Sequence, residues 1–244
     1  MASSFPDSEL RVTRRDDVKN IPLGRGFIQI CVGWGSSTET FDVHENLLTS
    51  RSPFFKAALS GQWRESIDRM IRLPEDEPDV VRQYLHFLST ADLGTKSHTD
   101  SGRYHVLEEC VGLVRLYVLA EKLQDTATKN RVMEEMVMIH RLHKNGRIPG
   151  QSYFVIHLIY AGTPPGSPMR RLIVNIFTER ATTKWLPSDE LTLPPEFLLE
   201  LTRGLLDRRA KPVDPTSTDD ATLYMESILA PGEALRPVPG PAIV

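Results

Sequence analysis

The chain has 244 residues, of which 40% are hydrophobic and 25% are charged, and its net charge of −3 gives no basic excess for binding nucleic acid. This composition is typical of a soluble globular protein with enough apolar residues for a sizeable core. The first twenty residues are polar and charged, and no run of about eighteen apolar residues occurs. We therefore expect neither a secretory signal nor a membrane span.

The two cysteines, Cys31 and Cys110, lie far apart in apolar stretches. Such a pair does not form a disulfide framework, and it cannot build a cysteine-rich zinc site. We interpret both as small buried hydrophobic residues in a reducing compartment. The sequence therefore predicts a protein of the cytoplasm, the nucleus or both.

The first predicted elements form a β-hairpin after a flexible N-terminal segment, residues 1–23. Residues 26–34 contain a strongly apolar strand, the sequence "GSS" turns the chain, and residues 38–43 form a second strand. Phe41 and Val43 share one face of that strand because its side chains alternate.

Two short helices follow the hairpin, with a break at Ser52. Serine is a favourable N-cap and proline a favourable first helical residue, so Ser52 and Pro53 predict the start of the second helix. The predicted helix ends at Gly61. Residues 68–74 form a short third strand that Pro74 stops.

Two longer helices are predicted over residues 75–90 and 105–123, separated by a polar, turn-rich loop at 90–104. The second helix is apolar on most sides, which predicts a central, buried position. Asp125 is the predicted N-cap of the next helix, and residues 144–151 have the composition of a linker.

The C-terminal part is predicted to be helical over residues 152–210 and disordered over the proline-rich tail 211–244. Ser167, which precedes a proline, predicts a second serine N-cap. The pair Arg170 and Arg171 is too small for a nucleic-acid-binding stripe, and we interpret both arginines as part of a solvated face.

Three segments in this order resemble the BTB/POZ family: "FDVHENLLTSRSPFFKAALSGQWRES" (41–66), "IRLPEDEPDVVRQYLHFLST" (71–90) and "LVRLYVLAEKLQD" (113–125). These sequences are similar to those of short BTB proteins abundant in filamentous fungi, and the resemblance covers residues 24–145. It implies an α+β BTB/POZ fold, with a small β-sheet flanked by a helical cluster. An all-α C-terminal extension over residues 152–210 follows.

Asp42, His44, Ser50 and Ser52 are the residue types of a hydrolase triad and lie within eleven positions. A triad serine usually stands on a strained turn, however, and no G-x-S-x-G motif occurs in the chain. The capping role explains Ser52 without chemistry. We expect the ring of His44 to form hydrogen bonds that fix the corner between strand and helix.

The sequence offers few candidate metal ligands. "HENLL" opens like the zinc motif H-E-x-x-H, but Leu48 stands where the second histidine is needed. His140 and His143 could share one helical face, and the sequence offers no obvious third ligand. We therefore predict no catalytic, cofactor-binding or metal-binding residue, no cofactor and no small-molecule substrate, so that the chain is not an enzyme.

The resemblance implies a protein–protein interaction module that self-associates or docks a partner. In many BTB proteins the partner is the cullin scaffold of a ubiquitin ligase, and the docking groove corresponds to residues 75–123. The triplet "VLE" (106–108) has the hydrophobic-x-acidic form that can help such docking, although its position does not single it out. The sequence contains no recognisable substrate-reading domain. The alternative is a transcription-associated or structural oligomerisation factor without a ligase role.

Overall fold

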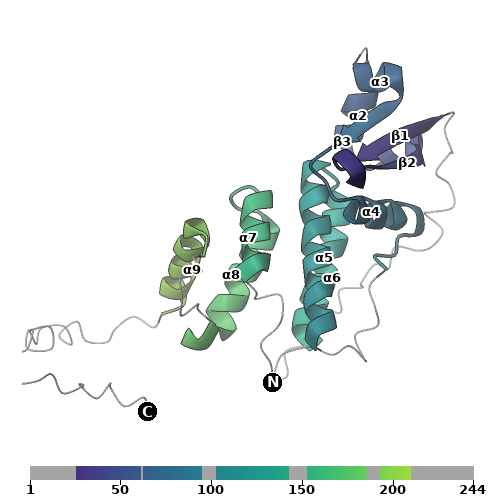
Figure 1. The fold of residues 1–244 in the computed structure, drawn as a ribbon. Helices are drawn as coiled ribbons and strands as arrows, with labels where there is room; N and C mark the ends of the chain where they lie inside the picture. The colour runs from purple at the N-terminus through teal and green to yellow at the C-terminus, as the bar shows by residue number, and fades with distance from the viewer. Residues whose placement is uncertain (1–25, 62, 95–102, 143–152, 186–192, 210–244) are drawn as a thin grey trace, which may run out of the picture. The chain divides into compact units, whose positions relative to one another are not determined.

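A computed structural model describes residues 26–61, 63–94, 103–142, 153–185 and 193–209 (Figure 1). The predicted N-terminal segment, the linker and the proline-rich tail lie outside these residues. None of the helices in the described ranges is both long enough and apolar enough to cross a membrane.

A three-stranded sheet begins the described chain. Its strands are β1 (Phe27–Val32), β2 (Glu39–His44) and β3 (Met70–Leu73), arranged in the order β2-β1-β3. The short 3-10 helix η2 (Gly35–Ser37) connects β1 to β2, which pair antiparallel as the hairpin pattern predicts. Strand β3 pairs parallel to β1, so the sheet is mixed.

Strand β1 is the centre of this sheet and shows the clearest alternation of side chains. Ile28, Ile30 and Val32 are completely buried, whereas Phe27 and Gln29 point to the other face and are exposed. Since β1 has a neighbour on each side, the buried face of the whole sheet is fixed by these three residues.

Three short helices pack beside the sheet: α1 (Glu45–Thr49), α2 (Pro53–Leu59) and α3 (Arg64–Asp68). The prediction of a strand from residue 68 was wrong at its start, because Asp68 ends α3. Arg69 then takes a left-handed conformation, with φ 53°, which turns the chain out of the helix and into β3.

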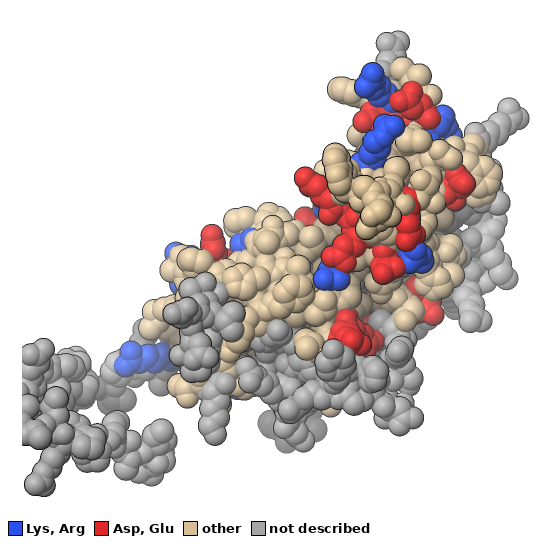
Figure 2. Space-filling view, in the orientation of Figure 1, with Lys and Arg blue, Asp and Glu red and all other residues tan. Residues whose placement is uncertain are grey.

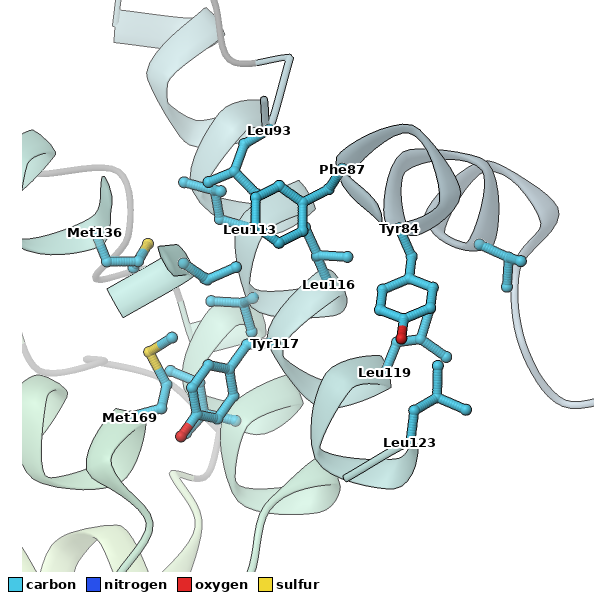
Figure 3. Close-up of a cluster of buried hydrophobic side chains, with 14 of the residues drawn as sticks. Tyr84, Phe87, Leu93, Leu113, Leu116, Tyr117, Leu119, Leu123, Met136 and Met169 are labelled. Atoms are coloured by element: carbon cyan, nitrogen blue, oxygen red, sulfur yellow. The ribbon is translucent and has the colours of Figure 1, made fainter. Parts of the chain in front are cut away.

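The helical cluster is formed by α4 (Pro78–Thr90), α5 (Arg103–Lys122) and α6 (Thr126–Leu142). Helix α5 is buried centrally, as its apolar sequence predicts. It packs against α4 on one side and against α6 and α7 (Tyr153–Gly162) on others. Figure 3 shows the side chains of Leu113, Leu116 and Leu119 between Phe87 and Tyr84 of α4 and the methionines of the later helices.

The C-terminal helices share this core. They comprise α7, α8 (Pro168–Arg180), the 3-10 helix η4 (Thr183–Trp185) and α9 (Pro195–Arg208). A Cβ atom added to Gly162 of α7 would lie 2.6 Å from Cγ2 of Val118, so glycine is what allows α7 to approach α5 so closely. One cluster of buried residues therefore runs from β1 to α9.

Two predictions for the C-terminal helices need correction. Ser167 is the N-cap residue of α8 and Pro168 begins the helix, as predicted, but the Ser167 side chain makes no capping hydrogen bond, and its hydroxyl lies instead 3.2 Å from that of Tyr117. Arg170 is buried, not solvated: its guanidinium donates to the carbonyl of Tyr160 at 2.8 Å and to the hydroxyl and carbonyl of Thr163. A positive group at these carbonyls complements the C-terminal end of α7. Arg171 is exposed.

Candidate interaction surface and a buried polar junction

Ser52 lies at the junction of α2 with the turn between α5 and α6. Its side chain is completely buried, and its hydroxyl oxygen accepts a hydrogen bond from the backbone N–H of Phe55 at 3.2 Å, which is the predicted N-cap. The same hydroxyl donates to the carbonyl of Leu123 at 2.6 Å, 71 residues away. Ser52 thus joins two parts of the domain in addition to capping a helix.

Asp125 is the second buried residue of this junction and caps α6 as predicted. It accepts hydrogen bonds from the backbone N–H of Thr128 at 3.0 Å, from the Thr128 hydroxyl at 2.7 Å and from the Tyr84 hydroxyl at 3.2 Å. Arg51 Nε lies 3.7 Å from the same carboxylate. Burial, together with the negative charge of Asp125, raises the pKa of Tyr84 above its ordinary value, so that its hydroxyl stays protonated and donates to Asp125.

The other residues of the triad pattern are separated from this junction. Asp42 is exposed on β2, and the Ser50 hydroxyl donates to the carbonyl of Leu47 at 3.3 Å. The expected hydrogen bonding of His44 fails at Nδ1, which has no hydrogen-bond partner in the described structure. The ring packs against Phe27 instead, with centroids 4.1 Å apart. Each polar group thus has a structural explanation of its own.

The described residues contain no group of three or more histidine, cysteine or acidic side chains able to hold a metal ion. His140 is buried in α6, and His143 lies outside the described residues. A shallow hollow of about 410 Å³ opens between α1 and α2, lined by such residues as Glu45, Asn46 and Lys56. Nothing in this arrangement of the described side chains resembles a reaction centre.

Helix α3 and its N-cap residue, Trp63, carry the largest exposed apolar side chains of the helices beside the sheet. Trp63 and Ile67 are 67% and 70% exposed. They are four residues apart, so they lie next to each other on one side of the helix. We call these two residues the α3 surface. Sequence reasoning missed it because this segment has no apolar periodicity long enough to indicate a helix.

Arg69 fixes the position of the α3 surface. Its guanidinium donates to the carboxylate of Glu45 at 2.8 Å and to the carbonyl of Phe27 at 3.3 Å. These bonds connect the end of α3 to the first residues of β1 and α1. The α3 surface is therefore attached to the sheet, although α3 itself is only five residues long.

Charged side chains of both signs cover α4 and its neighbours. Arg115 pairs with Glu77 at 2.7 Å and Lys122 pairs with Asp76 at 2.6 Å, while Arg82 bridges two acidic residues. Figure 2 shows the red and blue side chains intermingled on this face, without a stripe of one sign. This face is polar and lacks the excess of positive charge that phosphate binding requires.

The triplet at residues 106–108 lies inside α5. Val106 is only 2% exposed and belongs to the core, while Glu108 is exposed. A partner cannot reach the hydrophobic member of the triplet unless the helix unfolds. Its agreement with the docking pattern is therefore a coincidence.

A small mixed sheet flanked by a helical cluster defines an α+β domain. The family model of the BTB/POZ domain matches residues 29–125, and this part of the chain is therefore a BTB/POZ domain. The BTB domain of zebrafish PATZ1 is a similar solved structure, with 18% sequence identity, 45% of this chain and 75% of that chain covered, and a TM-score of 0.32. No curated protein matches the chain. BTB domains mediate protein–protein association, including self-association.

Proposed function

We propose that the chain is a non-enzymatic adaptor whose BTB/POZ domain binds a partner protein through the α3 surface. The observation that carries this proposal is the exposure of Trp63 and Ile67 on a helix that Arg69 holds in place. Tryptophan is strongly enriched among the residues that dominate binding energy at protein interfaces. A pair of adjacent, largely exposed apolar side chains fits a pocket on a partner protein better than it fits a solvated surface.

The finer form of the proposal is a substrate adaptor of a cullin-based ubiquitin ligase. In the adaptors that this family includes, the scaffold docks on helices and loops corresponding to residues 75–123. In this chain that stretch contains α4 and α5, and the ion pairs of Glu77 with Arg115 and of Asp76 with Lys122 connect the turn before α4 to α5. A fixed, polar helical face of this kind supports docking of a large scaffold.

An oligomerisation factor without a ligase role is the alternative, either structural or associated with transcription. In both forms we expect protein partners rather than nucleic acid, a membrane or a small molecule. We also propose that the protein works in the cytoplasm or the nucleus, since its two cysteines, Cys31 and Cys110, form no disulfide with each other.

Affinity purification with mass spectrometry tests the adaptor proposal. Tagged wild type is compared with the double variant W63A/I67A and with W34A as the matched control. Trp34 is 81% exposed and follows the C-terminal end of β1. Helix α3 is attached to the N-terminal end of the same strand, so the length of β1, about 20 Å, separates it from Trp34. All three proteins should have the same melting temperature, because the altered side chains are mainly solvated.

We expect W63A/I67A to lose at least one partner that wild type and W34A retain, by tenfold or more in recovered amount. Identical partners for all three proteins would refute the role of the α3 surface. Enrichment of a cullin with wild type supports the ligase form, and a cullin should also remain with W63A/I67A because residues 75–123 lie outside α3. Absence of any cullin would leave the oligomerisation alternative.

A further inference from the structure

Helix α9 carries a second exposed apolar surface, which lies outside the matched BTB/POZ domain. Four leucines of this helix are between 42% and 58% exposed, and at 3.6 residues per turn they share one side of the helix with a threonine. We call this side the leucine face; it consists of Leu198, Leu199, Thr202, Leu205 and Leu206.

Helix α9 cannot rotate to bury the leucine face, because its opposite side is already packed. Phe197 is completely buried, with its ring 5.1 Å from that of Phe177. A Cβ atom added to Gly204 would lie 2.8 Å from Cγ2 of Thr178, so α9 and α8 are in close contact there. The hydroxyl of Tyr160 donates to Glu200 at 2.6 Å. The leucines are therefore held outward by contacts on three other residues of α9.

The leucine face is symmetric about Thr202. Leucines stand three and four residues before it and three and four residues after it. A second α9 that runs antiparallel, with a twofold axis at Thr202, would place Leu198 level with Leu206 of the other copy and Leu199 level with Leu205. Such self-complementarity is what an isologous interface between two identical chains requires. The small threonine at the axis lets the two helices approach closely.

The area of the leucine face sets the strength of the contact. The four leucines together expose the equivalent of about two whole residues, on the order of 350 Å², which is within the size range of the largest apolar patch on a typical monomer. Two copies would bury on the order of 700 Å² from the leucines, less than the roughly 1,200 Å² of a stable interface. The pairing is therefore expected to be weak and reversible.

We propose that the leucine face of α9 binds the same face of a second copy of this chain, with the two helices antiparallel. This self-association is separate from the α3 surface and uses no residue of the matched BTB/POZ domain. It makes the adaptor a reversible dimer.

Disulfide cross-linking of the full chain tests the proposal. Helices packed about 8–10 Å apart, with Cα atoms about 2.3 Å from each axis, bring two facing Cα atoms to roughly 3.5–5.5 Å, and disulfides span about 4.4–6.8 Å. The variant T202C at about 100 μM, in a glutathione buffer, should therefore form a covalent dimer. E196C is the matched control: Glu196 is exposed on α9, but in the proposed pair the two copies of this residue lie about 18 Å apart along the axes.

We expect T202C to cross-link at least tenfold faster than E196C and than wild type, whose Cys31 and Cys110 give the background. Adding L205E to T202C should abolish the fast reaction without lowering the melting temperature, since Leu205 is about half exposed. Equal cross-linking rates for T202C and E196C would overturn the proposal.

The orientation is tested with a mixture of L198C and L206C that carry tags of different size. Antiparallel pairing predicts mixed dimers in excess over dimers of either variant alone, whereas parallel pairing predicts the reverse and would overturn the proposal. Cross-linking of T202C should be the same in the W63A/I67A background. If the adaptor proposal fails, T202C should still cross-link. If the α9 pairing fails, the partners recovered by affinity purification should still be the same.

Discussion

Replacing Ser52 by alanine is the most informative stability test of the BTB/POZ domain, because one hydroxyl group makes two buried hydrogen bonds. As an N-cap alone, a serine contributes about 1 kcal/mol to stability. The structure adds the bond to the carbonyl of Leu123 at 2.6 Å, which contributes about 1 kcal/mol. Loss of that donor inside the core also leaves the carbonyl poorly satisfied, which costs roughly 1 kcal/mol more. We therefore expect S52A to lose about 2–3 kcal/mol.

The assay is urea denaturation followed by circular dichroism, with S167A as the matched control. Ser167 is also buried and also precedes a proline that begins a helix, but it makes no capping hydrogen bond. S167A loses only the contact with the Tyr117 hydroxyl at 3.2 Å, which predicts a loss of about 1 kcal/mol or less. Unchanged m-values in both variants would show that the unfolding reaction is the same.

A loss in S52A of about 1 kcal/mol, equal to that in S167A, would refute this reasoning. It would mean that Ser52 acts only as a local cap and that its bond to Leu123 adds nothing. For a chain of this length the expected difference corresponds to several degrees in Tm, which a thermal scan resolves.

Three further predictions concern the core and its edges. The pKa of Tyr84 is raised above its ordinary value of 10, so its contribution to stability is complete below pH 10 and is lost as the pH rises. Above pH 10 the wild type should therefore lose about 1.4 kcal/mol of stability per pH unit relative to Y84F. Denaturation at a series of pH values measures this loss. G162A should destabilise by about 1–3 kcal/mol through a clash with α5. G112A should be neutral or stabilise by up to about 1 kcal/mol, because the added Cβ would make only an ordinary van der Waals contact at 4.0 Å. R170K should cost about 2–3 kcal/mol of stability, because lysine cannot satisfy the same three acceptors. R171K, at the exposed neighbouring position, should change the stability by no more than about 0.5 kcal/mol. Equal Tm values for the two variants would contradict the buried role of Arg170.

The features that the sequence predicted correctly are those encoded within a few residues. The hairpin follows from alternation in two neighbouring strands, and the caps at Ser52 and Asp125 follow from residue type and position. The central burial of α5 follows from its composition, because a helix that is apolar on most sides has no stable position at the surface. The BTB/POZ family was recognisable from three segments whose order is that of the observed elements.

The features that the sequence could not predict depend on contacts between distant residues. The bond of Ser52 to Leu123 spans 71 positions, and no local pattern indicates it. Arg170 and Arg171 are adjacent in the sequence, yet only Arg170 faces the end of α7 and becomes buried. The domain boundaries at residues 24–145 and 152–210, the fungal type and the candidate partners remain predictions.

The two proposed surfaces belong to one chain, and this has a consequence for binding. Helix α5 contacts both α4 and α7, and α7 approaches α5 closely at Gly162. A dimer formed through α9 would then present two α3 surfaces on one assembly. A partner with two binding segments of matching spacing would gain affinity by a factor on the order of 10²–10⁴ over a partner with one. The weak pairing expected for α9 therefore makes the adaptor selective for multivalent partners, since the partner itself stabilises the dimer that it requires.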